Sequence, residues 1–337
     1  MGLQLRIAFA LCFLAALHGP APAQDFPNRP ITILVPLAPG GGVDFVARTI
    51  GQKLSERLGK PVLIENRPGG GTIVAAVALA KAPDGYTLLL TPGATLSSNA
   101  TVYKNLPYNP RTDFVPVALP SQVAFTLVAN PSLPIHSIPE LIRYAKDKPG
   151  ELIVGTAGIA TTTHLAGELL SHLTDIKLRY SHYRGSPPAM NDVVGGSIQM
   201  MFADPVTGAE LAKAGKVRAL GVSGLNRVSV FPEVPPIADT VPGYDATNWH
   251  MILAPAHTPP DIVEKLAAEI RAIGAMPEVR QQIDKIGLEG AQQPVPGRAA
   301  DIPRGGHRPL GSARDANRAC WIAVEIERRI FTARSLG

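Results

Sequence analysis

Two loop segments, rich in glycine or threonine and each placed before an expected helix, are the strongest candidates for binding chemistry. The first is Pro39-Gly40-Gly41-Gly42, which follows a nearly continuous apolar run and leads into Val43-Asp44. Backbone N–H groups are free at a helix N-terminus, and glycine lets a ligand oxygen approach them closely. This segment therefore predicts an anion site, with a tight strand-to-helix turn as the alternative.

The second segment contains Gly155-Thr156-Ala157-Gly158 followed by Thr161-Thr162-Thr163-His164. Three consecutive hydroxyl groups, together with the free N–H groups of a helix start, could hold a carboxylate without a full positive charge. The alternative is a threonine N-cap, with the remaining threonines in solvent. If the two segments face each other across a cleft, the binding interpretation is favoured.

Three charged residues lie at or beside such loops: Asp44, Arg184 and Asp204. A negative charge at Asp44 suits the helix dipole but would repel a carboxylate, so we expect Asp44 to orient its loop or to meet an ammonium or hydroxyl group. Arg184 is the loop cation expected near a ligand, because a guanidinium can form a two-pronged contact with a carboxylate. Asp204 ends an expected strand, where ligands of α/β sheets bind, and its alternative role is to form a turn.

The spacing of the other candidate residues supports neither a metal site nor a catalytic site. His164, Glu168 and His172 share one helical stripe, but the two histidines lie about 12 Å apart along the axis and cannot reach one zinc ion unaided. Ser223 lies in Gly221-Val222-Ser223-Gly224, which lacks the spacing of a nucleophile elbow. The glycines match no phosphate-binding or dinucleotide fingerprint. We expect no metal, no cofactor and no catalysis.

The composition excludes a disordered chain and argues against a nucleic-acid binder. Of 337 residues, 45% are hydrophobic and 18% charged, which suffices for two α/β domains with real cores. Residues 298–337 hold eight arginines, no lysine and four acidic residues, whereas residues 24–297 hold 23 basic and 23 acidic side chains. The formal charge of +5 therefore comes from the two ends. Binding to phosphates needs a basic face, and the main body shows no such excess.

Residues 1–23 have the pattern of a secretory signal peptide. Arg6 is their only charge, residues 7–17 form a short apolar run, and Ala21-Pro22-Ala23 is a small-x-small cleavage site. We expect cleavage after Ala23 and export to the periplasm, with an uncleaved N-terminal anchor as the alternative. The rest of the chain has one cysteine, Cys320, so no internal disulfide is expected.

Strands and helices alternate along the chain in the βαβ manner of a doubly wound sheet. Residues 31–37 are typical of a strand buried on both faces, and the following helix carries an apolar face before Gly59 ends it. The pattern restarts near residue 126, and a further strand and helix follow from residue 251. We therefore expect two α/β lobes, with chain crossings near residues 124–128 and 248–254. The expected divisions are 24–125 and 250–297 for the first lobe and 126–249 for the second.

A series of short motifs spans residues 25–296. They are FPNRPI at 26–31, VPLAPGGGVD at 35–44, VLIENRPG at 62–69, KAPDGYTL at 81–88, LPY at 106–108, THLAGE at 163–168, YRGS at 183–186 and LAPA at 253–256. With these motifs the chain resembles the Bug family, the extracytoplasmic solute receptors of tripartite tricarboxylate transporters. The order of the motifs taken together, rather than any one of them, makes the resemblance specific.

The resemblance implies a periplasmic binding protein of type II, in which two lobes joined by a hinge close on a small organic carboxylate. Its ligand loops correspond here to residues 39–44, residues 92–97 with Gly93 and Ser97, residues 156–164, and the positions Tyr183, Arg184, Gly185 and Asp204. We expect a monomer that delivers its ligand to membrane permease subunits. Two alternatives stay open: a receptor that signals to a sensor kinase, and an exported hydrolase or lyase that uses Ser223 or His164.

The sequence departs from the family pattern at three places. Arg184 stands where the family usually has lysine, and the glycine loop 69–71 is one residue short. The last amphipathic helix of the family, with a motif such as F-x-x-x-I-A-R-W, is missing where it belongs. Residues 298–337 are rich in arginine and have no helical period. Our hypothesis is that this tail is translated from a shifted reading frame.

Overall fold

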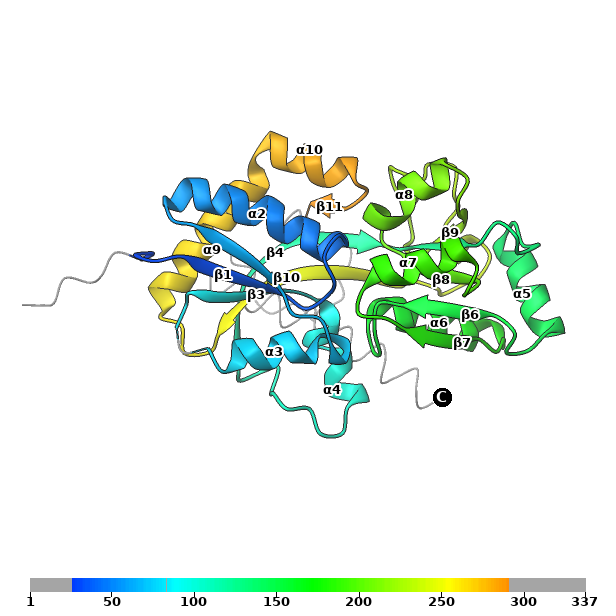
Figure 1. Ribbon diagram of the computed structural model, residues 1–337, viewed down its shortest axis with the longest axis horizontal. Coiled ribbons are helices and arrows are strands. Elements are labelled where there is room, and N and C mark those ends of the chain that lie inside the picture. The colour runs from blue at the N-terminus through cyan, green and yellow to red at the C-terminus, as the bar shows by residue number, and fades with distance from the viewer. Residues whose placement is uncertain (1–25, 83, 291–337) are drawn as a thin grey trace, which may run out of the picture.

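The computed structural model describes residues 26–82 and 84–290. The expected signal peptide with its cleavage site, and the tail 298–337 with the frame-shift hypothesis, lie outside the described residues. Within the described ranges, no helix is both long enough and apolar enough to cross a bilayer. Figure 1 shows two α/β lobes side by side, so the two-lobed α/β fold predicted from the sequence is confirmed.

The first lobe is built on a six-stranded sheet with the order β11-β4-β10-β3-β1-β2. The strands are β1 (Ile31–Val35), β2 (Val62–Asn66), β3 (Thr87–Pro92), β4 (Phe114–Ala124), β10 (Thr247–Pro255) and β11 (Glu289–Gly290). β1 pairs in parallel with β2 and β3, whereas β10 runs antiparallel to β3 and β4. The sheet is therefore mixed, because β10 enters it on the return from the second lobe.

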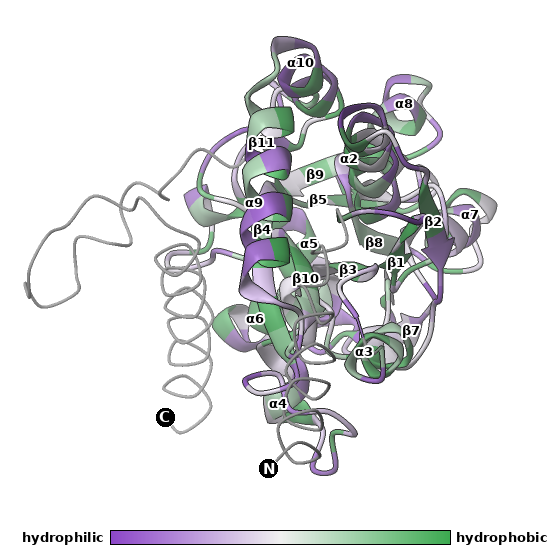
Figure 2. Ribbon diagram, turned by 90° about the vertical axis from the view of Figure 1, so that its left-hand side faces the viewer, coloured by the Kyte–Doolittle hydropathy of each residue, from purple (hydrophilic) through white to green (hydrophobic). Residues whose placement is uncertain are grey.

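Helices cover both faces of this sheet. Successive side chains of a strand point to opposite faces, and β1 is apolar on both, so each face needs a covering layer. The helices of the first lobe are α2 (Gly42–Leu58), α3 (Ile73–Ala80), α4 (Ser98–Val102), α9 (Pro260–Ala275) and α10 (Pro277–Lys285). Ile33 packs in the core with α2 and α9, and its neighbour Leu34 packs with α3 on the other face. α3 consists only of apolar residues and is coloured as hydrophobic in Figure 2.

Helix α2 positions the glycine segment at its N-terminus. It buries Val46, Ile50 and Leu54 on the face predicted from their spacing. The helix ends at Gly59, which has φ 64°, a left-handed conformation that glycine adopts without a steric penalty. This packing fixes the start of α2 at the edge of the sheet that faces the second lobe (Figure 1).

The second lobe has five strands in the order β7-β6-β8-β5-β9. Its elements are β5 (Thr126–Ala129), α5 (Ile138–Asp147), β6 (Ile153–Thr156), α6 (Thr162–Thr174), β7 (Arg179–His182), α7 (Ser186–Gly195), β8 (Met200–Ala203), α8 (Pro205–Lys213) and β9 (Arg218–Val222). β6 is parallel to β7 and β8, and β5 is antiparallel to β8 and β9. Leu127 packs with α5 and α6, and Val128 packs with α7 on the opposite face.

The hinge consists of the connections from β4 to β5 and from the second lobe back to β10. Ser223 joins them: its hydroxyl accepts a hydrogen bond from the Phe125 N–H (2.9 Å) and donates to the Ala246 carbonyl (2.9 Å). β10 pairs with β4 from Thr247 onward, so the chain is back in the first sheet at that residue. The sequence placed this strand too late because its first residues, Thr247 to His250, are mostly polar or aromatic.

Candidate functional site

A pocket lies between the lobes, with the hinge strands at its base. The residues that line it come from the first lobe, the hinge and the second lobe. The two lobes touch directly, because the Ala38 N–H donates to the Arg184 carbonyl (2.8 Å) and the Ser98 hydroxyl donates to the Ala160 carbonyl (2.8 Å). The free space between the lobes is small, about 30 Å³, which corresponds to about two water molecules. This conformation is therefore a closed one.

Seven of the residues predicted as ligand-binding line this pocket. They are Gly41, Gly42, Asp44, Thr161, Thr162, Thr163 and Asp204. Of the ten other lining residues, Val43, Pro92 and Ala157 lie in the predicted ligand loops, whereas seven were not predicted: Leu37, Ala38, Val123, Phe125, Ser186, Asn248 and His250. None of these seventeen residues is lysine or arginine. The described wall of the pocket therefore offers uncharged donors and two carboxyl groups.

Asp44 orients the glycine segment. Its carboxylate accepts hydrogen bonds from the Gly40 N–H (3.0 Å), from the Arg48 guanidinium (2.9 and 3.0 Å) and from the Asn66 amide (2.9 Å). Burial alone would raise the pKa of Asp44, but these hydrogen bonds outweigh it and hold the pKa below its ordinary value. Asp44 is therefore ionised, and its carboxylate holds the Gly40 N–H of its own loop. Orienting this loop is one of the two roles predicted for Asp44.

The N-terminus of α2 faces the second lobe across the pocket. A Cβ atom added to Gly41 would lie 3.7 Å from Asp204 Oδ2, and one added to Gly42 would lie 3.7 Å from Asp204 Oδ1. Pro39 and Gly40 are exposed, and Gly40 lies near Pro187 of α7 rather than in the pocket wall. The first N–H groups of a helix have no partner within the helix, so this end of α2 can receive an anion.

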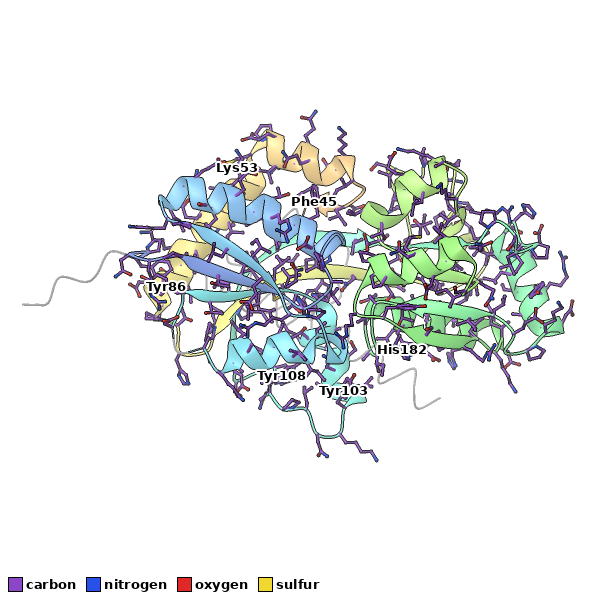
Figure 3. All side chains as sticks on the ribbon, viewed as in Figure 1. Phe45, Lys53, Tyr86, Tyr103, Tyr108 and His182 are labelled. Carbon is purple, nitrogen blue, oxygen red and sulfur yellow. The ribbon has the colours of Figure 1, made fainter. Side chains whose placement is uncertain are left out.

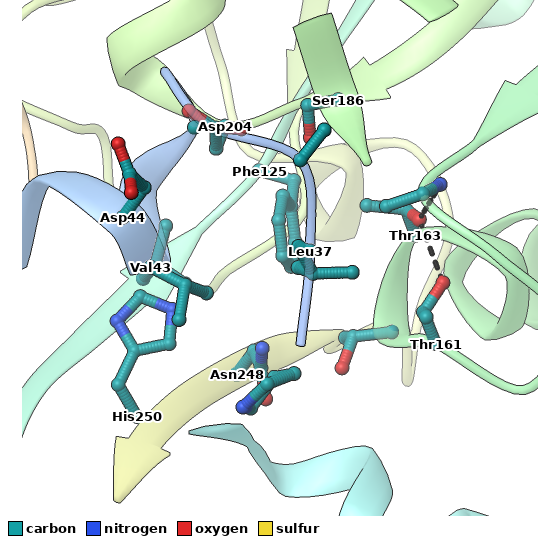
Figure 4. A pocket seen from close by; sticks show the side chains of 17 residues that line it. Leu37, Val43, Asp44, Phe125, Thr161, Thr163, Ser186, Asp204, Asn248 and His250 are labelled. Carbon is teal, nitrogen blue, oxygen red and sulfur yellow. Dashed lines mark hydrogen bonds between the residues drawn. The ribbon is translucent and has the colours of Figure 1, made fainter. Parts of the chain in front are cut away.

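The threonine segment of the second lobe is held by its own hydroxyl groups. Thr163 Oγ1 accepts from the Ala157 N–H (2.9 Å), and Thr161 Oγ1 donates to the Gly158 carbonyl (2.7 Å). The two hydroxyls also lie 3.0 Å apart, as Figure 4 shows. Thr161 is the residue before α6, but its side chain does not cap the helix. Thr161 and Thr163 thus shape the segment at the same time as they line the pocket.

Asp204 caps helix α8 and also lines the pocket. Its Oδ1 accepts from the Thr207 N–H (3.1 Å), and Ser186 forms a second hydrogen bond to its side chain. Burial raises the pKa of Asp204, and these hydrogen bonds only partly oppose the rise. Asp204 follows β8 and acts as the N-cap of α8. Asp204 also lies beside Gly41 and Gly42, which puts it in the wall of the pocket.

The base of the pocket is formed by the hinge strands, which the sequence did not predict as a site. Asn248 and His250 of β10 line it, together with Val123 of β4. The Asn248 side chain accepts a hydrogen bond from the Gly93 N–H (3.1 Å). The Ser97 hydroxyl donates to the Gly93 carbonyl (2.9 Å). Gly93 and Ser97 therefore shape the loop 92–97, and Pro92 is the part of that loop that reaches the pocket.

Four other predicted residues bring the lobes or loops together without lining the pocket. The Arg184 side chain is exposed, and its carbonyl accepts a hydrogen bond from the Ala38 N–H of the first lobe. A Cβ added to Gly185 would lie 3.0 Å from the Ala38 nitrogen, and Gly158 lies against Gly71. The Tyr183 hydroxyl donates to Asp192 of α7 (2.5 Å). Arg184 therefore lies at the boundary of the lobes, and its contact with a ligand stays a prediction.

Thr156 and His164 belong to a cluster behind the threonine segment. Thr156 Oγ1 lies 2.8 Å from His182 Nδ1, and the His164 ring packs edge-on against Tyr180 and His182. Burial lowers the pKa of His164 to about 4, helped by the neighbouring His182. Figure 3 labels His182 near the boundary of the lobes, opposite Tyr103 of the first lobe. This cluster supports the segment from the side away from the pocket.

The described residues contain no group of three or more His, Cys, Asp or Glu side chains that could hold a metal ion. His164 Nε2 lies 3.5 Å from Glu168 Oε1. Ser223 is fully buried, and both hydrogen bonds of its hydroxyl go to backbone groups of the hinge. Ser223 is therefore a structural anchor rather than a nucleophile.

Two α/β lobes in contact around a pocket, with helix N-termini facing it from both sides, define a two-lobed solute-binding protein. The chain belongs to the tripartite tricarboxylate transporter family of receptors, whose sequence model matches residues 46–295. The resemblance to the Bug receptors is thereby confirmed, and the protein is a receptor rather than an enzyme.

Three solved structures are similar to the described fold. Rpa4515 of R. palustris, solved with adipate, has 32% sequence identity and a TM-score of 0.82, and the match covers 92% of this chain and 97% of that one. The periplasmic binding protein BugD has 29% identity and a TM-score of 0.80, with 92% and 99% covered. MatC of Rhodopseudomonas palustris, with bound malate, has 30% identity and a TM-score of 0.77, with 90% and 98% covered.

Proposed function

We propose that the protein is a periplasmic receptor that captures a small organic carboxylate by closure of its lobes and delivers it to the permease subunits of a tripartite tricarboxylate transporter. The observation that carries the proposal is the pocket itself. It brings the N-terminus of α2 and the threonine segment before α6 to opposite walls, and both ends offer backbone N–H groups to an anion. The similar structures with adipate and malate support the same ligand class.

The chemistry of the wall favours a carboxylate that is held by uncharged groups. Backbone N–H groups, the hydroxyls of Ser186 and the threonines, the Asn248 amide and the His250 ring are the donors that the described wall offers. Bridging waters can add to them. The carboxylate of Asp44 is occupied by its own loop. Predicted contacts at Arg184, Tyr183 and Gly185 stay proposals for the mouth of the pocket, where those residues meet the first lobe.

Closure is the proposed binding event. The lobes touch at Ala38–Arg184 and at Ser98–Ala160, so they must separate to admit the ligand before they meet again around it. Ligand contacts that form only when both lobes meet shift the open–closed equilibrium toward the closed form. Export by the N-terminal signal, with cleavage after Ala23, and a monomeric state are part of the same proposal.

The test is a binding screen of the mature full-length chain, residues 24–337, by thermal shift and calorimetry. The panel is adipate, malate, succinate and citrate, with glucose and the diamine putrescine as solutes that carry no carboxylate. A carboxylate at 100 times its Kd should add about 2.7 kcal/mol to the unfolding free energy. Stabilisation by putrescine or glucose, with no response to any of the four carboxylates, would contradict the proposed ligand class.

Closure is tested by Gly71→Ala with Gly59→Ala as its matched control. Both glycines have a left-handed φ, 58° and 64°, so alanine strains both equally and should cost about 1 kcal/mol at each. Only at Gly71 would the new Cβ meet the other lobe, 2.2 Å from the Ile159 carbonyl oxygen. We expect Gly71→Ala alone to weaken ligand binding, by about tenfold or more, because the closed form becomes rare. Equal affinities of the two variants would show that closure as seen here is not part of binding.

A further inference from the structure

His250 stands out in the base of the pocket because of the strand geometry around it. β4 and β10 are antiparallel, and His250 lies directly opposite Ser121. Alternate residues of a strand share a face, so Asn248 and His250 point the same way. Both line the pocket, and Figure 4 shows the His250 ring beside Val43. The hinge strands thus present a second row of polar groups, separate from the two loop segments.

The chemical state of His250 is set by burial and by one hydrogen bond. The residue is 3% exposed, and its Nδ1 lies 2.9 Å from the Ser121 hydroxyl oxygen. Burial lowers the pKa of His250 to about 4, so the imidazole is neutral at pH 7 and carries a single N–H. If the Ser121 hydroxyl donates to Nδ1, the proton of the ring is on Nε2. The ring then offers one uncharged donor on the side away from Ser121.

We propose that His250 is a specificity-determining ligand contact, whose Nε2–H donates to a carboxylate oxygen of the ligand while Ser121 holds the ring in that tautomer. Ser121 is then a positioning residue. The inference rests on the proposed function and deepens it, since it names a side chain that selects an ionised carboxylate. A neutral N–H group can donate to an anion, and no second charged group then has to be moved out of water into the pocket.

The position of Asp204 indicates which way the ligand lies. Figure 4 shows Asp204 near the top of the pocket and His250 lower down, beyond Val43. Asp204 adds acceptor oxygens, and a negative charge when ionised, beside the N–H groups of Gly41 and Gly42, so an ionised ligand carboxylate is less favoured there than at the hinge. The hinge side has only the uncharged His250 and Asn248. The ligand therefore directs an ionised carboxylate toward the hinge and a hydroxyl or other donor group toward Asp204.

The location of His250 in the first sheet also gives an order of events. β4 and β10 are paired with each other along most of their length and belong to the first lobe. His250 and Ser121 therefore keep their relative position when the second lobe moves. The ligand can dock on His250 in the open form, and the threonine segment adds its contacts on closure.

The experiment compares His250→Leu, His250→Gln and Ser121→Ala with the native mature chain. Binding of adipate, malate, succinate and citrate is measured by calorimetry. Loss of a hydrogen bond to a charged group should lower affinity about tenfold to a hundredfold in His250→Leu. Glutamine restores an uncharged N–H donor, so His250→Gln should bind within about threefold of the native protein. His136→Leu, an exposed histidine far from the pocket lining, is the control and should bind normally.

A spectroscopic readout separates ligand contact from a purely structural role. The ¹⁵N signals of protonated and unprotonated ring nitrogens are well resolved in labelled histidine, and the His250→Gln variant assigns the His250 pair. With carboxylate bound, we expect Nε2 to be protonated and Nδ1 unprotonated. In Ser121→Ala the two tautomers should mix, and affinity should fall by less than in His250→Leu.

Each outcome decides between distinct ideas. If the native chain binds a carboxylate and His250→Leu binds it equally well, the inference is overturned while the proposed function stands. An unprotonated Nε2 in the carboxylate complex overturns it as well, even if His250→Leu fails to fold. If the native chain binds glucose or putrescine and none of the four carboxylates, the proposed function fails and the inference falls with it.

Discussion

Asp44 and Asp204 face the same pocket from opposite lobes, and both residues are almost completely buried, with 4% and 5% of their surface exposed. Each lies at the N-terminal end of a helix, α2 for Asp44 and α8 for Asp204. Their pKa values nevertheless shift in opposite directions, downward for Asp44 and upward for Asp204. A helix N-terminus alone therefore does not decide whether a buried carboxyl group is ionised.

The difference lies in the side chains around each carboxyl group. Burial raises the pKa of both, but Asp44 also receives two hydrogen bonds from the Arg48 guanidinium and one from Asn66. Asp204 has the Ser186 and Thr207 side chains and the backbone N–H groups of Thr207 and of Asp204 itself, with no cation among them. The first lobe thus uses an ionised aspartate to build its loop, whereas the second lobe keeps a more easily protonated one in the wall of the pocket.

The largest effect is expected for Asp44→Asn. The new asparagine amide would place an N–H donor against the Gly40 N–H or the Asn66 amide, which are donors themselves. The negative charge that pairs with Arg48 is also lost. We expect a loss of about 2 kcal/mol in the free energy of unfolding at pH 7, measured by urea denaturation. Because the pKa of Asp44 is lowered in the folded state, its contribution is complete above the unfolded pKa of about 3.9 and is lost as pH falls through the folded pKa. A difference between native and variant that did not shrink below pH 4 would contradict the role of the charge.

The opposite sign is expected for Asp204→Asn. Asparagine caps a helix about as well as aspartate does, so the bond from the Thr207 N–H can be kept. The pKa of Asp204 is raised in the folded state, so its ionisation opposes folding: the penalty is absent below the unfolded pKa and complete above the folded one. We expect the free energy of unfolding of the variant, measured by urea denaturation, to exceed that of the native chain by about 1 kcal/mol at pH 7 and to equal it near pH 3.5. A loss of stability at pH 7 would mean that the ionised carboxylate is stabilised by the end of α8.

The glycine segment and its helix illustrate how much of the site the sequence could predict. The spacing of Val46, Ile50 and Leu54 and the stop at Gly59 predict α2, and the apolar run before it predicts β1. Where a helix starts beside a buried strand, its N-terminus must lie at the edge of the sheet. Local pattern and chain geometry therefore suffice to place Gly41, Gly42 and Asp44 at the pocket.

The base of the pocket could not be predicted in the same way. β4 contains Pro116 and Pro120, which argue against a strand in a sequence, yet it is an eleven-residue strand with irregular pairing to β10. Asn248 and His250 are polar residues at alternate positions, which indicates that they share one face of a strand. Only the pairing of β10 with β4 shows that this face borders the pocket. The direction of a long side chain such as Arg184 also depends on neighbours from the other lobe, which no local pattern contains.

For Asp204 a local signal was present. Asp204-Pro205 followed by Thr207 has the N-cap aspartate and the proline in the first helical turn that start many helices. This pattern predicts α8, whose existence the alternation of strands alone did not reveal. What it does not predict is the approach of Asp204 to Gly41 and Gly42, because that contact depends on closure of the lobes.

The smallest effect, and the sharpest test of the contrast between the two aspartates, is expected for Arg48→Met with Lys53→Met as its control. Both cations lie on α2, but Arg48 pairs with Asp44 and Lys53 pairs with Glu56. Arg48 is 53% exposed, so solvent weakens its ion pair with Asp44. We expect Arg48→Met to lower the free energy of unfolding by less than about 1 kcal/mol. The pKa of Asp44, followed by carboxyl ¹³C NMR, should rise in Arg48→Met and stay unchanged in Lys53→Met, because burial would then be opposed only by Gly40 and Asn66. If Asp44 kept its low pKa without Arg48, its loop hydrogen bonds alone would hold it ionised, and the cation would no longer explain why the two aspartates differ.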